Sequence, residues 1–167
     1  SDGRIEDDAQ GVLAVDGLGV VGIRLTGSSA GGILTVVQEG LSGGLMDVVT
    51  RSGVAAVCLL DRMEELVVLA GNDAQVKANE GESDLTIADG YAGKDMDLIG
   101  NDLVLTSGYA GNIMTTNATG STEIVEAVAG NDVSVTSQGG TTTVGTITAA
   151  DFVQIHSKGS VLSSLNS

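Results

Sequence analysis

A short glycine-rich motif recurs along this chain of 167 residues at a nearly constant spacing. Gly90-Tyr91-Ala92-Gly93 returns as Gly108-Tyr109-Ala110-Gly111, and the Ala-Gly-Asn-Asp at 70–73 returns at 129–132. The β-prone segments that follow the repeats begin 18 to 22 residues apart, near Val12, Ile33, Val54, Ala74, Met96, Met114, Val133 and Phe152. A chain with such a period folds as a row of equivalent units, because one unit of this size cannot bury its own apolar residues.

Each repeat has the pattern strand, turn, strand, turn. Val133-Ser134-Val135-Thr136 alternates apolar and polar residues, a Gln-Gly-Gly turn follows at 138–140, and a second strand is expected near 143–147. The fold predicted is all-β: a parallel β-solenoid (β-helix) of about eight coils of about 20 residues each. Residues 1–11 are predicted to form an N-terminal polar cap, and 12–167 a single solenoid domain.

The composition fits a stack of parallel strands. There is no proline, and every strand inside a stack needs its backbone N–H for the neighbouring strand. An antiparallel sandwich remains the alternative, and it explains the alternation but not a tetrapeptide repeated at constant spacing. The segment 59–67 fits less well, because its apolar residues fall at helical spacing. It is either a short helical turn at a corner or an irregular strand centred on 66–69.

The charge of the chain excludes several classes of function. There are 22 Asp and Glu against 7 Lys and Arg, a net charge of −15. Nucleic-acid binding is not expected, because phosphates need a basic surface. No apolar run reaches the roughly 18 residues of a spanning helix, so membrane insertion is not expected either. An enzyme is not expected, since the acidic cluster at 80–102 lacks nearby arginines and aromatic platforms.

Aspartates recur at the corner that precedes the first strand of the later repeats. Neighbouring carboxylates about 5 Å apart repel by about 1 kcal/mol in water, so they splay into solvent, take up a proton or bind a shared cation. One hypothesis is a bridging Ca²⁺, which prefers oxygen ligands. The other is that Asp simply stabilises the turns and keeps the rod soluble. The candidate calcium ligands are Asp73, Asp95, Asp97, Asp102, Asp132 and Asp151; no other cofactor is expected.

Tyr91 and Tyr109 occupy equivalent positions of neighbouring repeats. We expect both at corners and stacked on each other, an arrangement that contributes about 0.5–1.5 kcal/mol. A stacking patch for a sugar ring is the functional alternative for these two side chains.

The repeats at 129–136 and 144–155 resemble the β-solenoid repeats, roughly 20 residues long, of large bacterial surface and secreted proteins, the filamentous-haemagglutinin type among them. The resemblance covers about residues 70–167. It implies an extracellular or cell-surface rod that serves adhesion or structure without cofactor chemistry.

Two functions are therefore expected. The first is a structural β-solenoid, a subunit of a fibre or sheath or a stalk module, that associates with itself head to tail. The C-terminal segment 160–167 has no evident helical or charged cap, and solenoids normally cap their ends with atypical polar segments. The second is a calcium-dependent adhesin or carbohydrate-binding module with a cell-surface glycan or host protein as partner.

Overall fold

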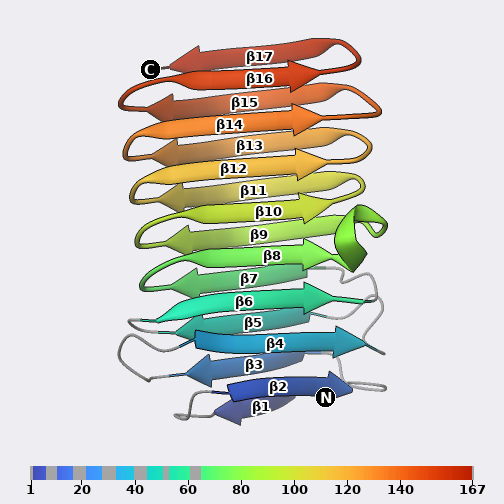
Figure 1. Cartoon of the computed structure of the whole chain (residues 1–167), viewed down its shortest axis with the longest axis vertical. Helices are drawn as coiled ribbons and strands as arrows, with labels where there is room; N and C mark the ends of the chain where they lie inside the picture. Colours follow the sequence, from blue (N-terminus) through green and yellow to red (C-terminus); the bar gives the residue numbers. More distant parts are fainter. Residues whose placement is uncertain are drawn as a thin grey trace.

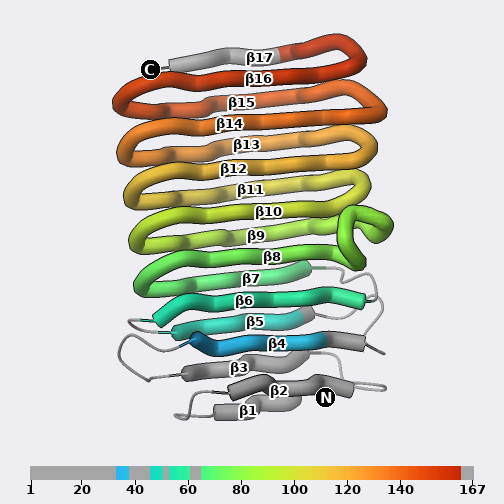
Figure 2. The backbone as a smooth tube through the Cα atoms, viewed as in Figure 1, coloured from blue at the N-terminus to red at the C-terminus, as the bar shows by residue number. Residues whose placement is uncertain are grey.

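The computed structural model describes residues 2–6, 11–16, 22–27, 33–39, 45–50, 53–60 and 65–166. The chain passes alternately through two sheets that face each other across a common core (Figure 1). Odd-numbered strands form one sheet in the order β1 to β17, here called the odd sheet, and even-numbered strands form the even sheet. Neighbouring strands within each sheet run parallel wherever their residues are described. β1 and β17 lie at opposite ends of the stack, and the backbone tube from β7 to β16 follows the successive coils (Figure 2).

The odd sheet consists of β1 (Asp2–Glu6), β3 (Gly22–Gly27), β5 (Leu45–Thr50), β7 (Glu65–Ala70), β9 (Leu85–Ala92), β11 (Leu103–Ala110), β13 (Thr122–Ala129), β15 (Thr142–Ala149) and β17 (Val161–Asn166). The even sheet consists of β2 (Gly11–Asp16), β4 (Ile33–Glu39), β6 (Val54–Leu59), β8 (Ala74–Ala78), β10 (Met96–Gly100), β12 (Ile113–Ala118), β14 (Asp132–Ser137) and β16 (Val153–Ser157). One short 3₁₀ turn, η1 (Asn79–Gly81), interrupts the corner between β8 and β9.

The predicted parallel β-solenoid is confirmed. Each predicted first strand is an even-numbered strand that begins within one residue of the expected position, and each second strand belongs to the odd sheet. The continuous stretch 65–166 holds between five and six coils, and β1 to β6 extend both sheets in the same order. The antiparallel alternative is wrong, because neighbours in each described sheet run parallel.

The structure describes only part of two predicted segments, the cap at 1–11 and the ambiguous segment at 59–67. Within the predicted polar cap, Asp2–Glu6 forms β1 and pairs with β3, while residues 7–10 lie outside the described part. Between 59 and 67, Leu59 ends β6 and Leu66 and Val67 belong to β7. The strand alternative therefore holds at both ends of that segment, and 61–64 lie outside the described residues.

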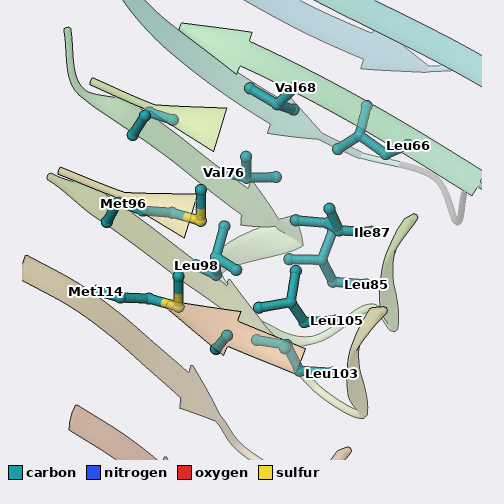
Figure 3. Packing of buried hydrophobic residues seen from close by; sticks show 14 of the residues in the cluster. Leu66, Val68, Val76, Leu85, Ile87, Met96, Leu98, Leu103, Leu105 and Met114 are labelled. Atoms are coloured by element: carbon teal, nitrogen blue, oxygen red, sulfur yellow. The ribbon is translucent and has the colours of Figure 1, made fainter. Parts of the chain in front are cut away.

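The core is a single column of aliphatic side chains between the two sheets. In the strands whose side chains are described, largely alternate residues point inward, and side chains from both sheets meet in the interior (Figure 3). Ten of the larger ones are fully buried: Met46, Leu59, Leu66, Leu85, Ile87, Met96, Leu98, Leu103, Leu105 and Met114. Burial of each such side chain stabilises the fold by about 1.5–3 kcal/mol, and the buried cluster runs through successive coils. The column therefore binds coil to coil.

Small and large residues alternate across the interior of the later coils. Gly90 and Gly108 are paired neighbours in the odd sheet. A Cβ atom at Gly90 would lie 3.1 Å from Cε of Met96, and one at Gly108 would lie 3.1 Å from Cε of Met114. The long methionine side chains thus fill the space that the glycines leave. In the next two coils the same odd-sheet position holds Ala127 and then Ile147.

Glycine at the corner between odd and even strands has a steric cause. Gly93, Gly111 and Gly130 stack directly on one another, and a Cβ at Gly111 would lie 2.1 Å from the carbonyl oxygen of Gly93. No side chain fits that distance without a backbone shift. The recurring Ala-Gly motif therefore marks the point of closest approach between coils.

Among the described residues, five polar side chains are buried between the two sheets. Ser137 Oγ lies 2.7 Å from Thr122 Oγ1 and 2.6 Å from Thr142 Oγ1, so three buried hydroxyls satisfy one another. Thr116 Oγ1, in contrast, is buried without a hydrogen-bond partner. A buried unpaired hydroxyl costs about 1–3 kcal/mol, so this position weakens the column.

Candidate functional sites: the corner carboxylates and the tyrosine column

Carboxylates at the first corner, between an odd strand and the next even strand, bind the backbone of the following coil. Asp73 Oδ1 accepts the N–H of Asp95 at 3.1 Å. Asp95 Oδ1 accepts the N–H of Ile113 at 3.2 Å and the side-chain amide of Asn112 at 2.9 Å. Asp132 Oδ1 lies 3.4 Å from the N–H of Phe152. Each carboxylate satisfies a backbone donor at the start of the next even strand.

The second corner, between an even strand and the next odd strand, repeats this arrangement. Asp84 Oδ1 accepts the N–H of Asp102 at 3.1 Å, and Asp102 Oδ1 accepts the N–H of Ser121 at 2.9 Å. Ser121 Oγ then accepts the N–H of Thr141 at 3.2 Å. A hydroxyl thus replaces the carboxylate in the later coil, and the ladder needs an acceptor rather than a negative charge.

These two corner ladders have a direction. At both corners the side-chain oxygen of one coil accepts from the coil that follows it in sequence. Backbone carbonyls accept from either neighbouring coil, as Asp95 O does from Ala74 N at 2.9 Å and Asn131 O from Asp151 N at 2.8 Å. Buried or half-buried backbone donors must be paired, and a corner lacks the regular partner of a strand. The aspartates therefore stabilise the stack, as one of the two hypotheses from the sequence holds, but across coils rather than within a turn.

The six candidate calcium ligands occupy four different places. Asp73, Asp95 and Asp132 share the first-corner position, and Asp102 lies at the second corner. The alignment of Asp151 with them is wrong by one residue: Asp132 is in register with Phe152, and the N–H of Asp151 donates to Asn131 O at 2.8 Å. The described residues contain no group of three or more His, Cys, Asp or Glu side chains arranged to hold a metal ion. Calcium binding stays a prediction.

A shallow cavity of about 260 Å³ lies on the outer face of the even sheet. Asp73, Asp95 and Asp97 line it together with uncharged neighbours from β8, β10 and β12. Partial burial raises the pKa of Asp97 above its ordinary value, and the nearby charge of Lys77 opposes that rise. The cavity therefore disfavours negative charge on Asp97.

Tyr91 and Tyr109 stack as predicted, with ring centroids 5.2 Å apart and ring planes inclined by 12°. They lie inside β9 and β11, not at corners, and are paired residues of the odd sheet. The corners begin two residues after the tyrosines, at Gly93 and Gly111, because Ala92 and Ala110 are still buried strand residues. The stack turns one face of each ring toward the other ring, while 44% and 41% of the two side chains remain exposed.

Comparison with known proteins gives no assignment: no family model, curated protein or solved structure matches this chain. The β-solenoid architecture stands on the structure itself, and the resemblance to filamentous-haemagglutinin repeats stays a prediction. Among the described residues, no helix has both the length and the apolar character needed to traverse a bilayer.

The sequence did not indicate which groups form hydrogen bonds with the corner acceptors. Asn101 and Asn112 donate side-chain N–H groups to Asp84 and Asp95 of the preceding coil. Ser121 continues the second-corner ladder. The available signal was the repeat itself, since each of these residues falls one coil after an acceptor in the register.

Proposed function

We propose that this protein is an extracellular structural rod, a subunit of a fibre or sheath or a stalk module, that extends by axial stacking of coils. The observation that carries the proposal is that core residues of β16 and β17 are incompletely buried. Val153 and Ile155 pack against the core but are only partly buried, because no described strand lies beyond β16 in the even sheet. An incoming coil would complete this part of the column.

The exposed apolar residues support the same reading. Phe152, Val161 and Leu162 lie in or beside the last two strands and are 48%, 44% and 66% exposed. Unpaired strand edges and apolar side chains together form a template for further pairing. We propose that a coil running in the same direction occupies this edge, because only such a coil continues the parallel ladder. In a fibre it is the first coil of a second copy, and in a stalk it belongs to a neighbouring module. Head-to-tail contacts of this kind propagate into open filaments.

The charge of the chain favours axial over lateral growth. A net charge of −15 makes the sides of two rods repel one another, whereas an end-on contact meets few described charges at β16 and β17. Repulsion of this kind is long-ranged at low salt and is screened within about 10 Å at 0.1 M. Low salt should therefore give separate thin filaments, and high salt should allow bundles.

Electron microscopy of the purified chain at several concentrations tests the proposal. We expect long assemblies one chain wide, whose length rises with concentration and does not change with a calcium chelator. Val161→Lys should shorten them, because Val161 continues the inward column of Thr122 and Thr142 and a charge there would oppose the incoming coil. Val125→Lys is the matched control, since Val125 is 48% exposed on the side of the rod.

Monomers at every concentration would contradict axial stacking. Filaments that Val161→Lys and Val125→Lys shorten equally would contradict the assigned end surface. A chelator that lowers the melting temperature of a monomer would instead support the calcium-dependent adhesin, because a ligand that binds only the folded state stabilises it.

A further inference from the structure

An apolar column runs along the outer face of the odd sheet, independent of the ends of the rod. Leu69 is in register with Tyr91, Tyr91 with Tyr109, and Tyr109 with Val128. We call these four residues the outer stripe. Leu69 and Val128 are half-buried and the two tyrosines are exposed. With strands about 4.8 Å apart, the stripe extends roughly 14 Å along the rod.

The stacking geometry determines which part of each tyrosine a partner can reach. The inner faces of the two rings cover each other at 5.2 Å. The register places Leu69 before Tyr91 and Val128 after Tyr109, so an aliphatic side chain follows each outer ring face in the column. Edges and hydroxyl groups are what remain exposed. A sugar ring stacks on an open aromatic face, and this column lacks one.

The charges beside the stripe all have one sign. The outward positions of β7, β9, β11 and β13 include Glu65, Asp89, Glu123 and Glu126, and no Lys or Arg lies in these four strands. Glu126 is exposed two residues before Val128, and Asp89 is exposed two residues before Tyr91. An apolar strip bordered by carboxylates complements a partner that carries aliphatic and cationic groups side by side.

We propose that the outer stripe is a docking surface for a basic protein segment that presents Arg or Lys next to aliphatic side chains. Exposed aromatic residues with an apolar surround mark protein contact sites, and the carboxylate border selects for cations. A second copy of this chain does not fit, since its own odd-sheet face carries the same negative border.

Titration with a short synthetic peptide of alternating Arg and Leu tests this proposal. The chain has two tyrosines and no tryptophan, so intrinsic tyrosine fluorescence reports on the stripe alone. We expect a saturable change in emission, with affinity falling as salt rises. A peptide of alternating Arg and Ser should bind at least tenfold more weakly, and one of alternating Glu and Leu should not bind.

Variants separate the stripe from general attraction to an acidic rod. Labelled-peptide anisotropy should show at least a tenfold loss for Tyr91→Thr with Tyr109→Thr, since Thr148 already occupies this column in β15. Asp89→Asn with Glu126→Gln should weaken binding and reduce its salt dependence. Asp97→Asn removes a carboxylate from the opposite sheet and should change neither.

Circular dichroism and the melting temperature establish that each variant is folded. If the double tyrosine variant loses its fold, Val128→Thr provides the same test at the end of the stripe. Equal binding of the Arg-Ser peptide, or equal losses for Asp97→Asn and the Asp89/Glu126 pair, would overturn the proposal in favour of unspecific charge attraction. Tyrosine-dependent binding of a neutral glycan without peptide binding would overturn it in favour of a sugar site.

Discussion

The described strands before η1 and the coils after it differ in the side chains that they turn outward. In β4 and β6 the outward positions are largely apolar, including Ile33, Val37 and Val54. Val54 occupies the register position of Asp73. From β8 onward the outward residues are mostly polar, and corner side chains from Asp73 onward bind the next coil. Buried hydroxyl groups are more frequent after η1, although Thr50 is already buried in β5.

In a stack of coils, apolar burial and directed hydrogen bonds have separate effects. Aliphatic burial is strong but has no direction, so it holds coils together without fixing their alignment. A hydrogen bond from one named side chain to one backbone N–H is weaker but is lost when a strand slips by a residue. We infer that burial binds the described coils to one another, and that the corner ladders described from Asp73 onward fix the register.

The largest predicted effect tests the packing of the later coils. Gly108→Ile should destabilise the protein by about 1–3 kcal/mol, because overpacking forces neighbours to move; a Cβ there already meets Leu105 at 2.7 Å. Met114→Val alone should cost about 1–2 kcal/mol through a cavity. Combined, they should cost at least about 1 kcal/mol less than their sum, as measured by urea unfolding. Val57→Ala in the early coils should be additive with Gly108→Ile, and simple additivity of the first pair would refute the complementarity.

The corner ladder gives the next effect. Asp95→Ala should cost about 1–2 kcal/mol, because the N–H of Ile113 and the side chain of Asn112 both lose their acceptor. Asp95→Asn keeps an oxygen at the same place and should cost less than half as much. Val54→Ala, at the same register position in the early coils, removes no hydrogen bond to a following coil. Chemical denaturation that gave equal losses for Asp95→Ala and Asp95→Asn would show that charge, not the hydrogen bond, matters.

The buried hydroxyls should show effects of opposite sign. Thr116→Val should stabilise the protein by about 1 kcal/mol, because it replaces an unpaired buried hydroxyl by a methyl group of similar size. Ser137→Ala should destabilise it by about 1–2 kcal/mol, because Thr122 and Thr142 both lose a partner. Thermal melts of the two variants provide the comparison, and a loss of stability in Thr116→Val would mean that its hydroxyl has a partner in solution.

The smallest effect concerns the pH dependence from Asp97. Its folded-state pKa is raised above the ordinary 3.8 by burial, so the folded protein binds this proton more tightly than the unfolded chain does. The contribution to stability is fully present below the ordinary pKa and is lost as pH rises through the raised value. Asp97→Asn should therefore gain stability relative to the parent as pH increases across that range. A constant difference between the two unfolding free energies from acid to neutral pH would exclude this origin.

The sequence predicted the architecture well because the repeat is itself a structural quantity. The starts of the even strands, the pairing of Tyr91 with Tyr109 and the absence of proline all follow from stacking in register. Asp151 was misplaced because the corner between Ala149 and Val153 has the same length as that between Ala129 and Val133, so Asp151 takes the register position of Asn131 and not of Asp132. The acceptor role of the aspartates could not be predicted, since it depends on the spacing between coils and not on the order of residues within one.

Distances between spin labels on the outer face of the even sheet test the stacked register most directly. Thr35, Gln75 and Gln154 belong to one column, with Gln75 four strand steps from Gln154 and Thr35 six steps from it. In a Cys58→Ala background, labels at Gln75→Cys and Gln154→Cys should lie about 19 Å apart, and labels at Thr35→Cys and Gln154→Cys about 29 Å apart. Separations that do not grow by about 10 Å between the two pairs would contradict a column of parallel coils in register.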